Sequence, residues 1–433
     1  MISFLTVILI GTLLLMLPIA TKAGETTTLN GALFTSTSAA CVTGLVVYDT
    51  YTHWTIFGQI VILTEIQIGG LGFITIGIFA MIMLRRKIGL GGRELIHDSL
   101  NTLGIKGSVR LVRRIVFGTL LFEGVGAIIL ACRFIPEMGV KSGIYYGIFH
   151  SISAFCNAGF DLMGYKEPYS SFMSYVSDPI VNITVMALII VGGIGFIVWE
   201  DVLIHKHHIR KYRFQSKIVL ATTAILLVGG TILFLIAESD NLFSEMTIGE
   251  SILAAAFCAV TPRTAGFNTV DVAAFTGGGA LLTICLMFIG GSPGSTAGGV
   301  KTATIAVIFL QIKSYLLGRR DSTAFGRRFD EGAIKRAEIV VFVNFTMAIC
   351  GCLLLLLGQG LPFLDVLFEV FSAIGTVGMS TGLTRELNTF SQLVIILLMY
   401  CGRVGSLSFA MSFTERRGRA EKLRYPEENI TVG

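Results

Sequence analysis

The sequence predicts an all-α membrane protein built from four tandem repeats, with eight transmembrane helices and four short re-entrant helices. Three observations lead to this prediction: an apolar composition, eight long apolar segments, and a motif that recurs four times. Of the 433 residues, 53% are hydrophobic and only 14% are charged. The mean hydropathy is +0.77. A water-soluble domain needs more charge to cover its surface, so this composition is typical of a membrane protein.

Eight apolar segments approach the length of about 20 residues that a helix needs to cross a bilayer. The first of them lacks the basic start and the small-residue cleavage site of a signal peptide, so we expect it to be retained. The eight predicted spans cover approximately residues 3–20, 56–83, 111–132, 179–203, 217–237, 280–310, 337–357 and 390–412.

Between the two spans of each pair lies a shorter, half-apolar segment. These segments are too short to cross the bilayer. Non-spanning backbone at membrane depth is tolerated only where it is buried in protein or lines a water-filled cavity. We therefore predict re-entrant helices near residues 29–42, 143–157, 248–263 and 362–377.

The basic residues set the expected orientation. Four connecting stretches, residues 84–114, 204–217, 311–338 and 413–433, carry 25 of the 33 Lys and Arg residues. Loops rich in Lys and Arg stay in the cytoplasm. We therefore expect a multi-pass protein of the cell membrane with both termini in the cytoplasm. Because topology explains the basic stretches, we expect the lipid bilayer, and no nucleic acid, as the surrounding partner.

One glycine recurs after each short segment, at positions 44, 159, 266 and 378. The separations are 115, 107 and 112 residues, and each glycine is followed by a bulky apolar residue. A fixed period of this kind indicates a repeat architecture. We expect repeat 1 at 1–84, repeat 2 at 85–205, repeat 3 at 206–312 and repeat 4 at 313–412, followed by a cytoplasmic tail at 413–433.

Two spans per repeat place all four repeats in the same orientation, so they can surround one axis along the membrane normal. The four short helices would then aim their C-terminal ends, which carry partial negative charge, at a single pseudo-four-fold pore. The chain leaves these ends through four segments: Val42, Thr43, Gly44 and Leu45; Asn157, Ala158, Gly159 and Phe160; Thr264, Ala265, Gly266 and Phe267; Thr376, Val377, Gly378 and Met379.

These four segments contain no Asp or Glu, so the available ligands are backbone carbonyls with some Thr and Asn side chains. Aligned carbonyls demand unusual backbone angles, which glycine permits. Rings of carbonyls that replace a hydration shell are the basis of potassium filters. We predict a filter that binds potassium ions; the alternative is that the glycines only end helices.

The third repeat differs from the others because glycine, serine and proline interrupt its second span. Such residues weaken a helix, and a broken helix at membrane depth is tolerated where it borders water. In repeat 4, an arginine stands where the other repeats have glycine, and facing a water-filled pore would relieve the cost of its charge. We expect the gate to consist of Gly290, Gly291, Ser292, Pro293, Gly294, Ser295, Thr296, Ala297, Gly298, Gly299 and Arg403.

Alternatives exist for these residues. Arg403 would be purely structural if it paired with Glu65 or Glu369. A phosphate-binding loop at 294–302 is disfavoured because Val300 separates Gly299 from the lysine that such a loop requires next to the glycine. Arg263 lies beside the third filter segment and either lines it or packs behind it.

The residues bear on three classes of function: a gated pore, an alternating-access symporter and an enzyme. An enzyme is disfavoured because no nucleophile–base constellation or metal motif stands out. An alternating-access cation symporter is the alternative to a gated pore, since such transporters use repeats and broken helices near the midplane. Those repeats are often inverted, whereas an even number of spans per repeat gives a parallel arrangement.

The sequence resembles the Trk/Ktr/HKT superfamily of potassium transporters over essentially its whole length, and looks most like the membrane subunit of a bacterial Ktr system. The resemblance implies sodium-stimulated potassium uptake by a homodimer with one pore per protomer. It further implies control by a cytosolic ring of regulatory subunits, which would bind the nucleotide (ATP or ADP). The motifs that carry it lie at residues 35–45, 67–73, 155–160, 261–268, 290–302, 375–378 and 401–405.

Overall fold

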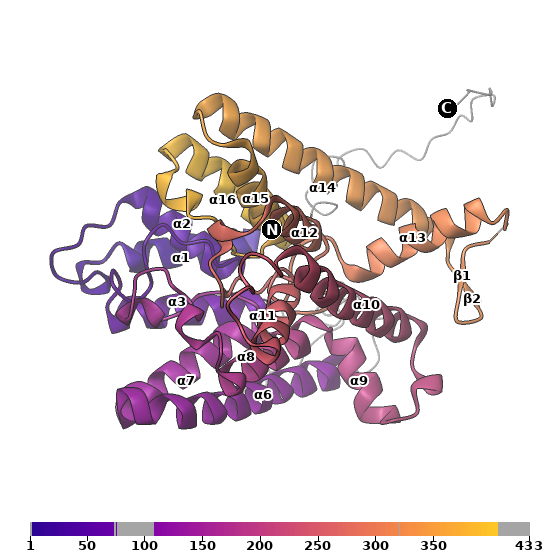
Figure 1. Ribbon diagram of the computed structural model, residues 1–433, viewed down its shortest axis with the longest axis horizontal. Helices are drawn as coiled ribbons and strands as arrows, with labels where there is room; N and C mark the ends of the chain where they lie inside the picture. The colour runs from indigo at the N-terminus through magenta and orange to yellow at the C-terminus, as the bar shows by residue number, and fades with distance from the viewer. Residues whose placement is uncertain (1, 73–74, 76–107, 320, 406–433) are drawn as a thin grey trace.

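The computed structural model describes residues 2–72, 75, 108–319 and 321–405. Within these ranges the chain is helical apart from one two-stranded antiparallel hairpin, as Figure 1 shows. The predicted all-α architecture therefore agrees with the described part of the chain. The boundary between repeats 1 and 2 and the predicted tail at 413–433 lie outside the described residues.

The described part of the chain contains α-helices, short 3₁₀ turns and one hairpin. The α-helices are α1 (Ile2–Leu15), α2 (Leu29–Ala40), α3 (Ile56–Leu71), α6 (Ser108–Met138), α7 (Val140–Phe155), α8 (Pro179–Gly193), α9 (Phe196–His205), α10 (Phe214–Ala237), α11 (Ile248–Val260), α12 (Gly277–Phe288), α13 (Thr302–Leu316), α14 (Glu331–Gly358), α15 (Phe363–Gly375) and α16 (Thr389–Val404). The hairpin pairs β1 (Thr323–Ala324) with β2 (Arg327–Arg328). Short 3₁₀ turns are η1 (Pro18–Ala20), η2 (Met163–Tyr165), η3 (Met173–Tyr175), η4 (Ile209–Lys211), η5 (Val272–Ala274) and η6 (Leu383–Glu386).

Three of the described helices, α6, α10 and α14, are long and apolar enough to cross a membrane by themselves. The pair α8 and α9 qualifies together, and α1, α3, α12, α13 and α16 are shorter apolar helices. Each predicted span thus contains at least one helix. The ends of the predicted spans at 56–83 and 390–412 fall partly outside the described residues, so the count of eight crossings stays a prediction.

Each of the four short predicted segments forms a helix of 12 to 16 residues, namely α2, α7, α11 and α15. Local sequence fixes where two of them begin. The Thr28 hydroxyl accepts the Gly31 N–H at the start of α2. Thr247 and Glu250 form a capping box at the start of α11. Such caps satisfy backbone N–H groups that have no partner inside the helix.

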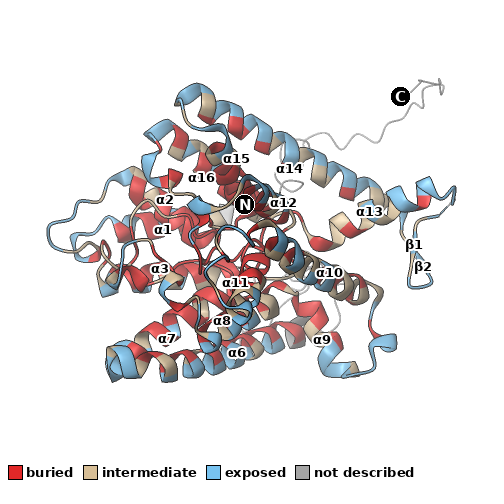
Figure 2. Cartoon of the chain, viewed as in Figure 1, coloured by how far each residue is buried: buried red, intermediate tan, exposed pale blue. Residues whose placement is uncertain are grey.

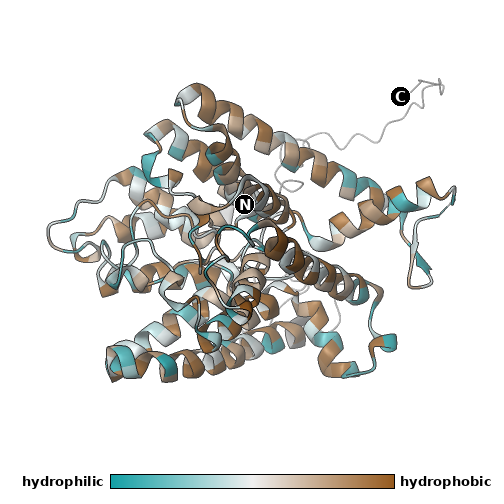
Figure 3. Ribbon diagram, in the orientation of Figure 1, coloured by the Kyte–Doolittle hydropathy of each residue, from teal (hydrophilic) through white to brown (hydrophobic). Residues whose placement is uncertain are grey.

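Each of the four short helices packs against a longer helix that neighbours it in the chain. Helix α6 runs along α7, α10 along α11, and α14 beside α15 and α16. Figure 2 shows buried residues concentrated toward the middle of the molecule, where these helices meet. Figure 3 shows that the residues of α6, α10 and α14 are hydrophobic along most of each helix. Examples that are exposed in the isolated chain are Leu121, Ile225, Ile236, Phe342 and Leu357, and exposed apolar faces of this kind suit contact with lipid.

The second span of repeat 2 is not the continuous helix that the sequence predicts at 179–203. Helices α8 and α9 meet at an angle of 97°. Gly195 adopts a left-handed φ of +97° at the bend, and the Phe196 N–H donates to the carbonyl of Gly294 at 2.8 Å. A contact from a distant part of the chain thus replaces the missing helical hydrogen bond. In repeat 3, α12 and α13 are separated at 289–301, where the sequence predicts an interruption.

Candidate functional site

The four predicted filter segments, 42–45, 157–160, 264–267 and 376–379, lie side by side in a closed ring. A Cβ atom at Gly44 would lie 2.5 Å from the carbonyl oxygen of Ala158. The same test places Gly159 at 2.7 Å from Ala265 O, Gly266 at 2.5 Å from Val377 O, and Gly378 at 2.1 Å from Thr43 O. Each glycine therefore faces the carbonyl of the next segment, and the fourth segment closes the ring on the first. A side chain at any of these positions would collide with backbone.

The backbone of all four segments adopts the same unusual conformation. The first residue of each segment has a left-handed φ, between +52° and +69°. The glycine two positions later is also left-handed, with φ between +72° and +96°. Non-glycine residues avoid this region, above all β-branched ones. Four-fold repetition of such strain means that the surrounding structure imposes it, and strained backbone of this kind concentrates at functional sites.

Hydroxyl groups at the ends of the short helices hold this conformation. The N–H of Gly44 donates to Ser38 Oγ and that of Gly378 donates to Ser372 Oγ, both at 3.1 Å. In the second segment, Ser153 Oγ donates to the carbonyl of Phe160 at 2.7 Å. These three serines occupy equivalent positions in the repeated motif.

The third segment uses a residue that the motif does not identify. Repeat 3 has Val260 at the serine position, which cannot form the bond. The next residue supplies it instead, because Thr261 Oγ1 donates to the carbonyl of Phe267 at 2.6 Å. A hydroxyl one position after an absent serine is the signal in the sequence that would have indicated this role.

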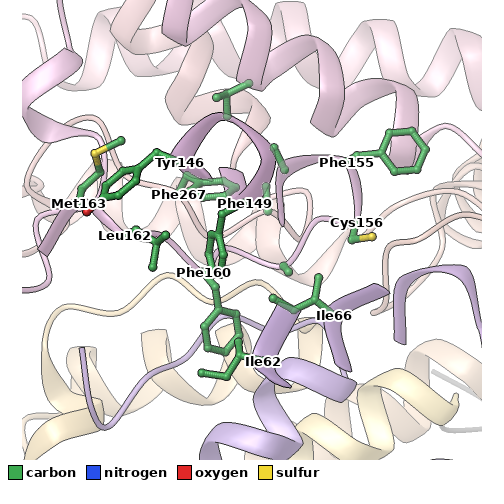
Figure 4. Packing of buried hydrophobic residues seen from close by; sticks show 14 of the residues in the cluster. Ile62, Ile66, Tyr146, Phe149, Phe155, Cys156, Phe160, Leu162, Met163 and Phe267 are labelled. Atoms are coloured by element: carbon green, nitrogen blue, oxygen red, sulfur yellow. The ribbon is translucent and has the colours of Figure 1, made fainter. Parts of the chain in front are cut away.

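The bulky residue after each glycine is buried and packs the ring from behind. Leu45, Phe160, Phe267 and Met379 are each at most 1% exposed. Figure 4 shows Phe160 in a cluster with Ile62 and Ile66 of α3 and Phe149 of α7. Close packing of this kind resists deformation, so the carbonyls of the ring are held in place.

The ring faces a cavity of about 300 Å³ on one side, lined by all four glycines. Asp49, Asp161, Glu167 and Asp271 also line this cavity, together with Arg385. Within the ring, the hydroxyls of Thr43 and Thr376 are buried and have no hydrogen-bond partner in the described structure. Buried hydroxyls without partners are uncommon. The site therefore offers carbonyl and hydroxyl oxygens, which are ligands suited to a hard cation.

The predicted gate loop, residues 290–299, lies directly against the other side of the ring. A Cβ atom at Gly298 would lie 2.1 Å from Thr376 Oγ1, and one at Gly299 would lie 2.9 Å from the carbonyl oxygen of Gly375. The loop is held by a bridge between Ile289 and Val300. Its glycines thus permit an approach to the ring that no larger residue would allow.

Arg403 of α16 ties this loop to a different repeat. Its guanidinium donates to the carbonyl of Thr296 in the loop and to the carbonyls of Gly69 and Gly70 at the end of α3. Neither carboxylate considered from the sequence is its partner in the described structure. Glu65 accepts from Ser36, and Glu369 accepts from Ser380 and Thr384.

A second cation also holds the loop. Lys301 Nζ donates to the carbonyls of Ala297 and Gly298, at 2.6 and 3.1 Å. The residue pattern around Lys301 predicts no role for this lysine and only disfavours a phosphate-binding loop. Arg263 lies behind the ring: its Nη2 contacts Thr223 Oγ1 at 3.3 Å, and the side chain is only 4% exposed.

Comparison with known proteins identifies the family. The sequence model of a family described as cation transport protein, TrkH, matches residues 2–420. The chain belongs to the TrkH family of cation transport proteins. It is 41% identical over 437 residues to the potassium/sodium uptake protein NtpJ of Enterococcus hirae, covering 100% of this chain and 96% of that protein. It is 39% identical to the Ktr system potassium uptake protein B of Bacillus subtilis, covering 100% of this chain and 95% of that protein.

The fold agrees with TrkH-family membership. The crystal structure of the potassium transporter TrkH from Vibrio parahaemolyticus matches 96% of this chain and 85% of that chain, with a TM-score of 0.74 at 19% identity. The resemblance found in the sequence is thus confirmed. The chain is a multi-pass membrane protein of a cation transporter family, and it is not an enzyme.

Proposed function

We propose that this TrkH-family chain takes up potassium ions across the cell membrane through one pore, whose selectivity filter is the ring of four segments. The observation that carries the proposal is the closure of the ring, in which each glycine lies against the carbonyl of the next segment. A dehydrated cation on the axis of such a ring would exchange its hydration shell for carbonyl oxygens. All four repeats contribute to one site, so the pore is pseudo-four-fold.

Potassium is the cation that this ring suits best. The ring contains no carboxylate, and a field of neutral carbonyl dipoles favours the cation that is easier to dehydrate. The relatives named above include two potassium uptake proteins. The ends of α2, α7, α11 and α15 add partial negative charge at the same place.

The loop at 290–299 and Arg403 form the gate of this pore. The loop contacts the ring next to Thr376, and the positive charge of Arg403 lies beside the loop. A cation leaving the ring would meet this obstruction and repulsion. Displacement of the loop would then open the pore.

The functional unit includes partners. Two relatives are named as Ktr system proteins B and D, which supports a multi-subunit system. We propose a homodimer whose basic cytoplasmic loops contact a cytosolic nucleotide-binding ring, with sodium stimulating uptake. Of those loops, the described hairpin presents Arg327 and Arg328 on an exposed surface. ATP or ADP would act on the partner ring, while lipid surrounds the apolar helices.

An alternating-access symporter is the second candidate. The broken helices at 194–195 and 289–301 are features that such transporters share. A single ring contributed by four segments in the same conformation favours the pore instead. Potassium flux that follows the voltage and the potassium gradient in both directions would support the pore, whereas flux tied in a fixed ratio to a second ion would support the symporter.

The direct test is potassium uptake in cells that lack their own uptake systems. We expect wild type, expressed with a matching cytosolic subunit, to restore uptake of potassium or rubidium-86 and to respond to external sodium. Gly44→Ser places a side chain against Ala158 O and is expected to weaken potassium uptake or admit sodium. Wild type without uptake, or uptake indifferent to Gly44→Ser, would overturn the filter assignment.

The cavity outside the ring predicts a dependence on external pH. Desolvation raises the pKa of Asp161 to about 7; a hydrogen bond from the Met163 N–H opposes this, and the Asp49 carboxylate adds to it. Asp161 is therefore charged above this pH and neutral below it, so a cation in the cavity is attracted more strongly at high pH. We expect the KM for potassium to rise about threefold to fivefold between pH 8 and pH 6, the size of one Coulomb interaction in water at about 4 Å.

Uptake kinetics at both pH values, for matched variants, check this expectation. Asp161→Asn should remove the pH dependence and fix the KM at its low-pH value. Glu167→Gln alters another carboxylate on the same cavity and should retain the dependence. A pH profile unchanged by Asp161→Asn would contradict the assignment.

A further inference from the structure

Asn157 differs from the residues at its position in the other filter segments. The other repeats have Val42, Thr264 and Thr376 there. Asn157 is only 1% exposed, and its side chain carries both donors and an acceptor. Its Nδ2 donates to the carbonyl of Arg263 at 3.1 Å and contacts Thr264 Oγ1 at 3.4 Å. The amide therefore joins the second filter segment to the third.

The other end of the same amide meets the gate loop. Thr296 Oγ1 lies 3.2 Å from Asn157 Oδ1 and 3.3 Å from the carbonyl of Phe155. Thr296 is completely buried, and it is also the residue whose carbonyl accepts from Arg403. One residue of the loop is thus bonded to Arg403 through its backbone and to the filter through its side chain.

The bend between α8 and α9 provides the seat for this loop. The Ser292 N–H donates to the carbonyl of Gly193 at 3.0 Å, and the Thr296 N–H donates to that of Gly192 at 3.3 Å. In return, the Phe196 N–H donates to Gly294 O. These bonds hold Thr296 next to Asn157. Displacement of the loop would break the contact between Thr296 and Asn157.

We infer that Asn157 is a positioning residue that couples the gate to the filter. With the loop seated, Thr296 orients the Asn157 amide, and this amide holds the carbonyl of Arg263 and the hydroxyl of Thr264 at the edge of the third segment. When the loop leaves, the amide loses its Thr296 partner and the filter relaxes. Ion selectivity then depends on the position of the gate. This inference rests on the proposed function, because it assigns a regulator to the same filter.

Replacement of the Thr296 hydroxyl by a methyl group tests the coupling. Thr296→Val keeps the shape of the side chain and removes its bonds to Asn157 and Phe155. The matched control is Thr302→Val: this threonine is also buried and its hydroxyl lies 3.1 Å from Ser292 Oγ in the same loop, away from the filter. Purified full-length protein in liposomes would be assayed for potassium, rubidium and sodium flux.

We expect Thr296→Val to change the ratio of potassium to sodium flux by about fivefold, the change that corresponds to one hydrogen bond. Thr302→Val should alter all fluxes by the same factor and leave the ratio unchanged. In an Asn157→Ala background, Thr296→Val should have no further effect on the ratio, since the coupled partner is gone.

Two results would overturn the inference: equal effects of Thr296→Val and Thr302→Val on the ratio, or additive effects of Thr296→Val and Asn157→Ala. Either result can be interpreted only if the wild-type protein conducts potassium in preference to sodium. A wild type without potassium flux would instead overturn the proposed function, so the two failures are distinguishable.

Discussion

Gly378→Ala is expected to lower potassium uptake about tenfold to a hundredfold. The added methyl group would strain the backbone of the ring by about 1–3 kcal/mol, and ion binding in the ring or passage through it would fall by the factor that this energy corresponds to. A Cβ atom here would lie 2.1 Å from the carbonyl oxygen of Thr43 and 2.8 Å from the Cα atom of Gly44. Both atoms belong to backbone, which cannot rotate away as a side chain can. The two segments must therefore separate, and the ring loses its symmetry.

The matched control is Gly24→Ala. Gly24 has the same φ, +93°, but apart from its chain neighbours no atom of the described residues lies within 4 Å of its Cβ position. Both variants therefore carry the same backbone penalty, and only Gly378→Ala carries the collision. Uptake kinetics and the amount of protein in the membrane should be measured for both. Equal uptake by the two variants, at equal amounts of protein, would show that the close approach in the ring has no role in transport.

The residues that form the ring could be predicted from the sequence because the same motif, a short apolar helix followed by a glycine, occurs four times. Gly44, Gly159, Gly266 and Gly378 share one spacing from a short apolar helix, and a fixed period excludes most other arrangements. The same repetition identified the interruption in repeat 3, where Pro293 and several glycines have no counterpart in the other repeats. Both the ring glycines and the interruption depend on local residue types, so they can be predicted from a single sequence.

The bend at 194–195 could not be predicted in the same way. Repeat 2 reads Gly192, Gly193, Ile194 and Gly195, a pattern close to that of Gly69 to Gly72 in repeat 1. In both repeats the helix has ended by the last glycine of the pattern, since Gly72 and Gly195 have φ of +82° and +97°. In repeat 2 the Phe196 N–H, just beyond the bend, donates to the carbonyl of Gly294 in repeat 3. Local sequence carries no information about a partner a hundred residues away.

The partners of Arg403 illustrate a related difficulty. A buried arginine suggests a carboxylate partner, and Glu65 and Glu369 were the natural candidates. A helix that stops early, however, leaves carbonyls without an intrahelical donor. The broken loop of repeat 3 supplies such a carbonyl at Thr296, and the last turn of α3 supplies those of Gly69 and Gly70. Every residue has a backbone carbonyl, so the types of the side chains do not predict which carbonyls will accept from Arg403.

Arg403→Ala is expected to raise potassium flux in the absence of the regulatory partner by about tenfold or more, since hydrogen bonds to a charged group contribute about 1.5–3 kcal/mol each. The guanidinium joins the loop at 290–299, the proposed gate, to the end of α3. Without it, the loop loses its link to α3 and keeps its bonds to the bend between α8 and α9 and to Lys301. Loss of the positive charge also removes the repulsion that a resting cation would meet.

Flux into liposomes containing purified protein, with no cytosolic subunit, measures this effect directly. Arg403→Lys retains the charge but cannot reach carbonyls in two directions, so it should give an intermediate flux. Arg263→Met removes a different arginine, which is buried and bonds to Thr223 behind the ring, and should not raise flux. If Arg403→Ala left the flux at the wild-type value, Arg403 would have to be removed from the gate. If Arg263→Met raised flux equally, the increase would reflect general loosening of the helices around the ring, and the loop would no longer be the specific obstruction.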